Sequence, residues 1–425
     1  MSVAREIEQP RRDTADVVIV GAGAAGLAAA IFCARAAPEA RIVCVDGAKS
    51  IGAKILVSGG GRCNVTNRVV IEEDFSGGDR RFIRNVLRAY PAPRAAAFFA
   101  ELGVSLHEEE DGKYFPVSNR ARTVLDALLS ALRDCGASLE VSRRVERVER
   151  VERGFMVTTR DSATYEAPLV VLATGGRSLP KTGSDGAGYA FARALGHGCV
   201  ETTPALVPLL LADSRYATLT GVTHNVGVTV TTDGGSVRLD GAMLWTHFGL
   251  SGPVILNASR HWLRARVEGR AAAVLLHVLP RTTFAELEHW LQTQQRQHPR
   301  ALVRTVVASR LPASVADAWV EAAGIDRAMT LAHLARDARR TLIATLLETP
   351  LDVTDSRGYN YAEVTAGGIP LGEIDSATME SRLCPGLYLI GEILDVDGRI
   401  GGFNFQWAWS SAWVAANAIG RKLRA

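Results

Sequence analysis

The segment Asp16-Val-Val-Ile-Val-Gly-Ala-Gly-Ala-Ala-Gly26 sets the architecture of this 425-residue chain. Its apolar half predicts a buried β-strand, and its glycine-rich half predicts a tight turn into an Ala- and Leu-rich helix that ends near Ala36. The apolar run over residues 41–45 predicts a second strand, which is followed by Asp46. Strand, helix and strand in this order form a right-handed βαβ unit, whose ligand site lies at the carboxyl ends of the strands.

The glycines of this segment have the spacing GxGxxG, which is the dinucleotide-binding fingerprint. Gly21 permits the tight turn, Gly23 lets the backbone approach a pyrophosphate at the helix N-terminus, and Gly26 allows the helix to pack on the strands. Asp46 follows Gly26 by 20 residues and would accept hydrogen bonds from ribose hydroxyls. The sequence therefore predicts a Rossmann-like domain, although the fingerprint alone does not separate NAD from FAD.

Three later motifs favour FAD. The apolar run 169–176 ends in small residues, which suits a chain passing beside a bulky cofactor. The run 385–392 predicts a turn and a strand that place Glu392 beside a polyol such as ribityl. The motif 401–406 opens a final helix expected over residues 407–419, and the partial positive charge of its N-terminus would stabilise an anionic reduced flavin.

The composition excludes several classes of protein. With 47% hydrophobic residues the chain can bury a real core, and its 48 basic and 45 acidic residues leave a net charge of only +3. This balance disfavours a nucleic-acid or membrane partner. Six cysteines without a CxxC pair or a Cys/His cluster predict reduced thiols and no metal site. The start of the chain lacks an apolar signal region, so we expect a soluble, cytoplasmic protein.

The distribution of glycine clusters, strand patterns and helix patterns along the chain predicts one domain that is interrupted by an insertion. Glycine clumps mark the first 200 residues and return near the C-terminus, so we assign residues 1–200 and 356–425 to one nucleotide-binding domain. Residues 201–281 are rich in strand patterns, and residues 348–355 could complete that part. Residues 282–347 read as several short helices.

Seven motifs spread over nearly the whole chain carry a family resemblance. The two longest are Lys54-Ile-Leu-Val-Ser-Gly-Gly-Gly-Arg-Cys-Asn-Val-Thr-Asn67 and the run 391–407, GEILDVDGRIGGFNFQW. The others are residues 21–26, 114–118, 173–178 with 182–186, 245–252 and 364–368. With them the sequence resembles the aminoacetone oxidase/BaiN (YhiN) family of FAD-dependent flavoproteins. The resemblance implies an α/β fold: a Rossmann-like FAD-binding domain of the glutathione-reductase type, interrupted by a β-barrel-like insertion and a helical insertion.

The resemblance also implies an activity. Family activities include oxidation of small amino ketones with release of peroxide and NAD(P)H-linked reduction of conjugated steroid double bonds. We therefore expect hydride transfer between flavin N5 and a small organic substrate, with NAD(P)H or dioxygen in the other half-reaction. Because the chain has one complete GxGxxG, any NAD(P)H must dock directly over the flavin as a transient co-substrate. Substrate identity, oxidase or reductase, NADH or NADPH, and the oligomeric state stay open.

Carried over residue by residue, the resemblance implies FAD contacts from the glycine turn, the second strand, the 54–64 segment and the C-terminal motifs. These residues are Gly21, Gly23, Ala24, Ala25, Gly26, Asp46, Gly47, Lys54, Gly60, Gly61, Arg62, Cys63, Asn64, Val145, Ala173, Thr174, Gly175, Gly391, Glu392, Gly402, Phe403 and Asn404.

Two residues are candidates for catalysis. Lys54 is expected either to approach the flavin N5 region as a donor or to point to solvent. His247 lies among glycine and aromatic residues in WTHFGLSG, where proton transfer and a structural hydrogen bond are equally compatible with the pattern.

Four other polar residues have two interpretations each. Cys63 has no partner two residues away, which favours a close-packed FAD contact over a redox thiol. Arg62 would neutralise the pyrophosphate or bind a substrate carboxylate. Glu363 and Asp395 lie near expected cofactor loops, where each could equally be a helix-end or turn partner.

Two alternatives to this function remain. A plain NAD-dependent dehydrogenase would use only the first fingerprint and would leave the later glycine motifs unexplained. A flavin-holding RNA-modification or scaffold protein would use the inserted region to bind a macromolecule, which the near-neutral charge disfavours. We expect a small-molecule substrate, no nucleic acid and no membrane.

Overall fold

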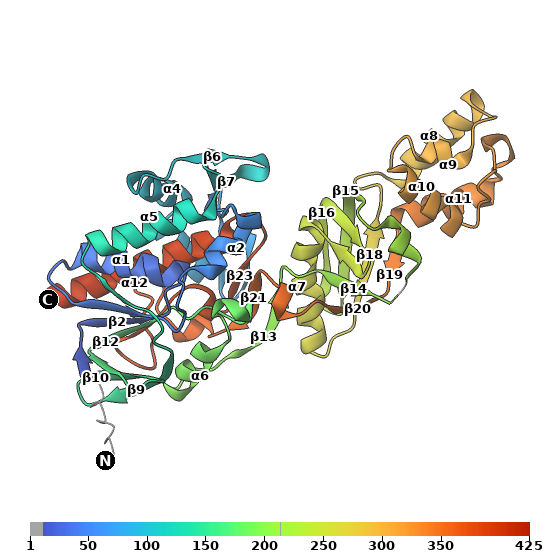
Figure 1. Ribbon diagram of the computed structural model, residues 1–425. Helices are drawn as coiled ribbons and strands as arrows, with labels where there is room; N and C mark the ends of the chain where they lie inside the picture. The colour runs from blue at the N-terminus through green and yellow to red at the C-terminus, as the bar shows by residue number, and fades with distance from the viewer. Residues whose placement is uncertain (1–11, 213) are drawn as a thin grey trace, which may run out of the picture. The chain divides into compact units, whose positions relative to one another are not determined.

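The computed structural model describes residues 12–212 and 214–425. The polar tail over residues 1–11, on which the absence of a signal region was inferred, lies outside the described residues. The chain divides into a first unit, Met1–Thr202 with Glu363–Ala425, and a second unit, Thr203–Ala362, drawn by residue number in Figure 1. Each unit has a hydrophobic core of its own. In the described part of the chain, no helix is long and apolar enough to cross a membrane.

A five-stranded parallel sheet forms the centre of the first unit, in the order β22-β12-β2-β3-β8. The residues of the four strands other than β8 are all buried, as expected for a parallel sheet that is covered on both faces. Val20 is in register with both Val45 and Leu172, so the chain leaves three strands at one edge of the sheet. The strands are β2 (Val17–Val20), β3 (Ile42–Val45), β8 (Ser138–Glu140), β12 (Leu169–Leu172) and β22 (Leu387–Leu389).

Two layers cover this sheet, one on each side (Figure 1). Three helices lie on one side: α1 (Ala24–Ala36), α5 (Ala121–Asp134) and α12 (Phe403–Arg424). On the other side lies a sheet ordered β1-β11-β10-β9 and made of β1 (Arg12–Thr14), β9 (Val145–Val151), β10 (Gly154–Thr159) and β11 (Thr164–Ala167). Small residues bring α1 and α12 close together, since a Cβ added to Gly420 would lie 2.6 Å from the Cβ of Ala36.

The first unit contains further elements outside these three layers. Two helices, α3 (Arg80–Ala89) and α4 (Ala92–Glu101), follow one another closely, with Pro91 at the start of the second helix. Further elements are α2 (Ala53–Gly61), β4 (Thr66–Asn67), β5 (Phe75–Gly77), β6 (Leu106–Glu108), β7 (Lys113–Pro116), α6 (Ala187–Ala194), β21 (Val364–Gly368) and β23 (Val396–Gly398). Short 3-10 turns are η1 (Glu72–Asp74), η2 (Glu110–Gly112), η3 (Pro180–Thr182), η7 (Leu371–Glu373) and η8 (Gly391–Ile393).

The second unit is built on a seven-stranded sheet ordered β19-β18-β15-β16-β17-β14-β20, in which all neighbours are antiparallel. Its strands are β14 (Leu209–Leu211), β15 (Thr223–Thr232), β16 (Gly235–Thr246), β17 (Gly249–Ser251), β18 (Ala272–His277), β19 (Thr349–Leu351) and β20 (Val353–Ser356). Strand β13 (Val200–Ala205) contains the division between the units.

The strand-rich and helical parts of the second unit share one core. Trp245 of β16 and Trp319 of α10 are both buried, with ring centroids 5.7 Å apart. The indole of Trp319 also donates to the carbonyl of Thr345 at 3.1 Å. The helices of this unit are α7 (Pro253–Val267), α8 (Phe284–Gln297), α9 (Val303–Val307), α10 (Ala313–Ala322) and α11 (Arg336–Leu347), with 3-10 turns η4 (Ser214–Leu219), η5 (Leu331–His333) and η6 (Tyr359–Tyr361).

Candidate functional site

The three fingerprint glycines meet different surroundings at the end of β2. A Cβ added to Gly26 would lie 1.8 Å from the carbonyl oxygen of Gly21, and one added to Gly21 would lie 2.6 Å from the carbonyl oxygen of Ala173. Gly21 also has φ +103°, which favours glycine. No atom lies within 4 Å of a Cβ added to Gly23. Packing therefore requires Gly21 and Gly26, whereas Gly23 faces open space at the N-terminus of α1.

Asp46 joins the ends of two strands. One of its carboxylate oxygens accepts from the amide of Ala22 at 2.6 Å, and the other accepts from the amide of Ala48 at 2.7 Å. A carboxylate has about four acceptor positions, so both oxygens can also receive a ligand hydroxyl. The next residue, Gly47, approaches Arg144, since an added Cβ would lie 2.8 Å from its Cδ.

The segment around Arg144 belongs to the same neighbourhood. Arg144 forms an ion pair with Asp185 at 2.5 Å. It directly precedes Val145, the first residue of β9, whose side chain is buried. This ion pair connects the start of β9 to the segment that follows the ATGG turn.

The C-terminal Gly-Glu motif contacts both α1 and α12. A Cβ added to Gly391 would lie 2.9 Å from the Cβ of Ala25. The amide of Gly391 donates to Ser411 at 3.0 Å, and its carbonyl accepts from the indole of Trp407 at 3.1 Å. Since Gly21 approaches Ala173, the ends of β2, β12 and β22 all converge near the N-terminus of α1.

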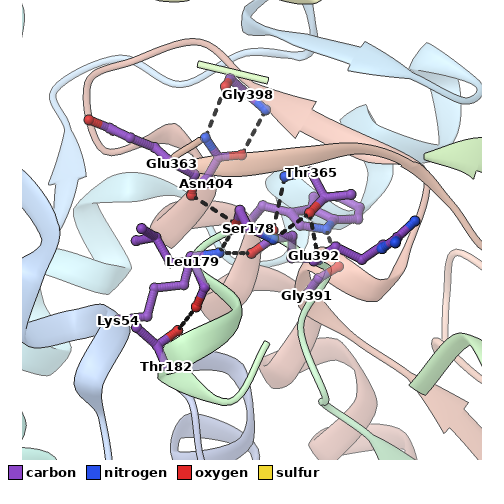
Figure 2. Close-up of polar contacts among 12 residues, drawn as sticks. Lys54, Ser178, Leu179, Thr182, Glu363, Thr365, Gly391, Glu392, Gly398 and Asn404 are labelled. Atoms are coloured by element: carbon purple, nitrogen blue, oxygen red, sulfur yellow. Dashed lines mark hydrogen bonds and ion pairs between the residues drawn. The ribbon is translucent and has the colours of Figure 1, made fainter. Parts of the chain in front are cut away.

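Next to these strand ends lies a network of charged and hydroxyl side chains, shown in Figure 2. Lys54 of α2 forms an ion pair with Glu392 and donates to the hydroxyl of Ser178 at 2.5 Å. Ser178 and the amide of Thr365 each donate to the same oxygen of Glu392, at 2.9 Å. The hydroxyl of Thr365 accepts from the amides of Arg177 and Ser178, at 2.7 and 3.1 Å. We call Lys54, Ser178, Thr365 and Glu392 the edge network.

The edge network reaches solvent through its two charged members, while Ser178 and Thr365 are buried. The side chain of Lys54 is 28% exposed and that of Glu392 is 17% exposed. An ammonium group has three N–H donors, and Glu392 and Ser178 occupy two of those of Lys54. The remaining N–H is available to a ligand.

Glu363 stands beside this network, and its carbonyl accepts from Ser178 at 3.3 Å. Its side chain is exposed, yet desolvation by the surrounding protein raises its pKa above the ordinary range of a glutamate. The positive charge of Lys54 opposes that rise.

The 54–64 segment is shaped by positive φ angles. Helical geometry stops at Ser58, and Gly60 has φ +68° with no atom within 4 Å of an added Cβ. Gly61 is similarly open, with its nearest neighbour at 3.8 Å. Cys63 is fully buried, and desolvation raises its pKa to about 12, so its thiol is not a reactive thiolate at neutral pH.

Arg62 has protein partners of its own. It forms an ion pair with Glu109 at 2.7 Å, and its guanidinium lies 4.0 Å from the centroid of the Phe115 ring. A surface cavity of about 460 Å³ is lined by Arg62, Glu109, Glu110 and Lys113.

The N-terminus of α12 packs on the same segment. A Cβ added to Gly402 would lie 2.5 Å from the carbonyl oxygen of Thr66. In the amide orientation that satisfies its neighbours, Asn64 accepts from the amide of Gly402 at 3.1 Å. Phe403 is buried, and Asn404 bonds both the amide and the carbonyl of Gly398, at 2.8 and 2.9 Å (Figure 2). The helix begins at Phe403, four residues earlier than predicted, so these residues form its first turn.

Most of the predicted cofactor residues therefore lie around one edge of one sheet. The structure brings together Gly21, Ala25, Gly26, Ala173, Thr174 and Gly391, it joins Lys54 to Glu392, and it joins Asn64 to Gly402. His247 belongs to the second unit, where it is exposed in the loop between β16 and β17.

This edge fits a dinucleotide. Its open glycines leave room for close approach of a ligand, and two hydroxyls of the ATGG region, those of Thr174 and Ser184, are buried without a hydrogen-bond partner among the described residues. The edge also presents the carboxylates of Asp46 and Glu392 and the N-termini of α1 and α12. Together these are acceptors for hydroxyl groups and positive helix ends for phosphate or an electron-rich ring.

Ser178 and Thr365 were missing from the predicted site. Both occur in motifs that carried the family resemblance, at 173–178 and 364–368, but their roles depend on contacts with Glu392 that only the folded chain creates. For Ser178 the available signal was a hydroxyl residue directly after a glycine-rich strand end, whereas Thr365 lies within β21, ahead of its glycines.

The fold and the sequence are similar to those of known proteins. A family model described as HI0933-like protein Rossmann domain matches residues 15–418. A 3-dehydro-bile acid delta(4,6)-reductase from Clostridium scindens is 33% identical over 95% of this chain and 98% of its own length. A ribosomal RNA dihydrouridine synthase from Escherichia coli is 34% identical over the same shares of both chains.

A solved quinol-fumarate reductase is similar in fold. It has a TM-score of 0.51 and 17% identity, over 97% of this chain and 71% of the other. The fold class predicted from the sequence is confirmed by the family model and by this structural likeness.

Proposed function

The chain belongs to the HI0933-like family of Rossmann-domain proteins, and on that basis we propose that it is an FAD-dependent reductase of a ring double bond conjugated with a carbonyl group. The membership confirms the resemblance inferred from the motifs. The expected class of enzyme, an oxidoreductase, is likewise confirmed at the level of the family. The proposal goes further in its choice of reaction and in the roles of individual residues.

The reaction is inferred from what two relatives share. The name of the bile-acid enzyme describes reduction at the 4,6 double bonds of a steroid with a ketone at position 3, which is a conjugated system. The name of the other relative describes formation of dihydrouridine, in which a ring double bond conjugated with a carbonyl group has been reduced. Both reactions add a hydride and a proton across such a bond. We take this common step as the reaction of the present chain.

Residues at the strand ends hold the cofactor. Gly23 and the N-terminus of α1 bind its pyrophosphate, and Asp46 binds ribose hydroxyls through the free acceptor positions of its carboxylate. Glu392 binds the polyol, and the N-terminus of α12 binds the electron-rich edge of the ring. When bound and reduced by NAD(P)H, the flavin would supply the hydride.

The edge network and Glu363 organise the reacting end of the site. Glu392 and Ser178 hold the ammonium group of Lys54 in place before any ligand binds. The third N–H of Lys54 therefore has a fixed direction, and little side-chain entropy is lost when a ligand accepts a hydrogen bond from it. Glu363 holds the proton that the reduced double bond requires, because its raised pKa keeps the protonated form populated closer to neutral pH. The observation that carries this proposal is an accessible Lys54–Glu392 pair beside a glycine-lined strand edge.

A second substrate class is favoured by one observation. Two relatives, from Escherichia coli and Haemophilus influenzae, are ribosomal RNA dihydrouridine synthases and match this chain at 34% and 32% identity. Uridine in RNA is therefore the second candidate substrate. The near-neutral charge of the chain is the argument for a small molecule, because RNA binding usually relies on a basic surface.

The deciding experiment separates these substrates. Purified protein loaded with FAD is reduced anaerobically with NADH or NADPH, and reoxidation is then timed with a 3-oxo-4,6-diene steroid acid, with ribosomal RNA and with air. Rapid reoxidation by the steroid supports the small-molecule reductase, and rapid reoxidation by RNA with formation of dihydrouridine supports the second candidate. Rapid reoxidation by air alone, with peroxide, would replace the reductase by an oxidase.

Cofactor binding has a separate test. Gly23→Ala places a methyl group in open space at φ −77°, so the cofactor-free protein should unfold as the wild type does. Its FAD affinity should fall by tenfold or more, roughly the effect of losing one or two good contacts. Gly372→Ala, also with no atom within 4 Å of the added Cβ, is the matched control and should retain FAD. Protein that never acquires flavin absorbance would refute the proposed cofactor.

A further inference from the structure

The second unit presents an arginine that lies against two aromatic rings. The guanidinium carbon of Arg357 is 3.4 Å from the centroid of the Tyr361 ring and 4.5 Å from that of Phe248. The ring of His247 meets Phe248 edge-on at 5.1 Å. Tyr361 is 50% exposed and His247 is also exposed, so the group is open to solvent. We call Arg357, Phe248, Tyr361 and His247 the arginine cluster.

The backbone holds this cluster in place. The amide of Arg357 donates to the carbonyl of Pro208 at 3.0 Å, directly after the end of β20. The amide of Tyr361 donates to the carbonyl of Gly358 at 3.0 Å, which closes a turn back toward the arginine. Gly358 has φ +69° and no atom within 4 Å of an added Cβ, so one side of the turn is empty. The backbone that carries Arg357 and Tyr361 is therefore fixed, and the guanidinium itself packs on the two rings.

The guanidinium has no acid to neutralise it. Among the described residues no carboxylate forms an ion pair with Arg357, and none of its N–H groups has a hydrogen-bond acceptor. Asp355 lies two residues away, where its carboxylate accepts from the amide of Ser356 at 2.7 Å. Other arginines of this unit do have acidic partners, namely Arg238, Arg264, Arg270, Arg281, Arg304, Arg327 and Arg339.

We propose that the arginine cluster is a binding site for an organic oxyanion, a carboxylate or a phosphate, carried on a flat unsaturated ring system. The planar guanidinium presents N–H donors at its edge in the fork geometry that fits two oxygens of one anion. Tyr361 is 50% exposed and so offers ring surface beside the guanidinium, on which a flat ring stacks. Restraint of the guanidinium by the Tyr361 and Phe248 rings reduces the entropy lost when the anion binds.

The same chemistry has two sources, a free acid such as a steroid carboxylate and a nucleotide phosphate. Both combine a flat ring with an oxyanion, so the structure predicts that the site recognises the combination. The site stands without the proposed function, because it concerns binding to the second unit and requires no turnover.

Another arginine of this unit provides a matched control. Arg310 lies 4.3 Å from the centroid of the Trp290 ring and is exposed, and no second ring among the described residues contacts it. Its charge also acts on Glu286, whose pKa is lowered mainly by hydrogen bonds to Thr283 and in part by Arg310. Arg310→Gln therefore removes the same charge from the same unit without touching the arginine cluster.

Calorimetric titration of the full FAD-loaded chain, without reductant, tests the site. The probes are uridine 5′-monophosphate, uridine, 3-oxo-4-cholenoic acid, 4-androstene-3,17-dione and inorganic phosphate. At least one ring-bearing anion should bind about tenfold or more tightly than its neutral counterpart, as expected for a charge-assisted pair. Arg357→Gln should remove that difference and Arg357→Lys should retain only part of it, whereas Arg310→Gln should leave it intact.

Each outcome of the titration either supports or overturns the proposal. Preference for the nucleotide or for the steroid acid identifies the source of the anion and supports the site in either case. Equal binding of charged and neutral probes, equal losses in the Arg357 and Arg310 variants, or inorganic phosphate binding as tightly as both ring-bearing anions would each overturn the proposal. Should Arg357→Gln unfold the protein, Tyr361→Leu is the second variant: it keeps the charge and removes a stacking surface, so it should weaken the binding of the ring-bearing anion and leave that of inorganic phosphate unchanged. Equal binding by the variant and the wild type would overturn the proposal.

Discussion

Two polar networks of the first unit use similar side chains around central residues of different accessibility. In the edge network the central cation, Lys54, is 28% exposed beside open glycines, while its partner Ser178 is buried. The second network joins Glu373 to His197 at 2.7 Å and His197 to Ser381 at 2.8 Å; the side chain of the central His197 is 0% exposed, and that of Glu373 is 24% exposed. We call the second group the sealed network.

Glu373, His197 and Ser381 of the sealed network are connected in the order acid, histidine and serine, as in a catalytic triad, but their role is structural. Glu373 accepts only, so Nδ1 of His197 carries the hydrogen and Nε2 accepts from the hydroxyl of Ser381. The oxygen of Ser381 in turn accepts from the amides of Leu383 and Cys384, at 3.0 and 2.8 Å. Every donor and acceptor of the serine is thus used, and no room is left for a substrate. The comparison teaches that solvent access and an unused donor separate a functional site from a structural one.

The largest expected difference between the networks is in stability. His197→Leu would leave the buried hydroxyl of Ser381 without its acceptor, whereas Glu373 stays 24% exposed and keeps the amide of Gly198, so the free energy of unfolding should fall by about 1–3 kcal/mol. Lys54→Met breaks a partly exposed pair and should cost about 1 kcal/mol or less. Urea unfolding of both variants, without FAD, measures the difference. Equal losses would remove the distinction between a sealed and an open network.

This contrast also marks what the sequence could reveal. The run from Asp16 to Gly26 carries part of its own geometry, since the positive φ of Gly21 and the close approach of Gly26 to Gly21 are local requirements that spacing encodes. The first turn of α12 was anticipated as a cofactor element for the same reason. Local patterns are sufficient where strand, turn and helix are consecutive.

The networks could not be predicted in this way. Lys54 and Glu392 are separated by 338 residues, and they meet because β22 and β2 both lie next to β12. No periodicity encodes that order of strands. Likewise His197 carries no motif, and its partners come from a turn and a loop that precede β22. Pairings of this kind depend on the register of distant strands, which single-sequence patterns do not contain.

The next largest expected effect is on the rate of substrate reduction, for which Glu363 is proposed to deliver the proton. Desolvation raises its pKa, so the protonated, proton-delivering form should be lost as pH rises through that value, and turnover should decline on the alkaline side. Glu363→Gln should lower the rate of substrate reduction by about 100-fold and abolish this decline. Stopped-flow reoxidation of reduced enzyme between pH 5 and 9 measures both.

A stability measurement serves as the control for Glu363. Because its folded pKa lies above the unfolded value, the folded protein binds more protons in that interval, and its contribution to stability falls as pH rises. The glutamine variant should lack this fall and be at least as stable as the wild type at pH 7. A variant that loses activity together with stability would assign Glu363 a structural role.

A smaller effect is expected for cofactor retention. Glu392→Gln keeps the shape of the side chain but removes the charge that pairs with Lys54 and accepts from Thr365. FAD affinity should fall about tenfold, the value of one charge-assisted hydrogen bond. Equilibrium dialysis with FAD measures it, and Glu373→Gln in the sealed network is the matched control. If the control lost as much FAD, the edge network would have no special part in holding the cofactor.

The smallest effect should distinguish the two serines. Ser178→Ala removes a hydroxyl that connects Lys54 to Glu392, while their direct ion pair remains, so stability should change by less than about 1 kcal/mol. Ser381→Ala leaves two amides and the acceptor nitrogen of His197 without partners in a buried turn, and should lower the free energy of unfolding by about 1–2 kcal/mol.

The effects of the two variants on the reaction rate should have the opposite order. Ser178→Ala should slow hydride transfer several-fold by loosening Lys54, and Ser381→Ala should leave the rate unchanged. Unfolding curves and single-turnover rates for both variants give the two rankings. If the Ser381 variant folded normally but transferred hydride slowly, the sealed network would have a part in the reaction.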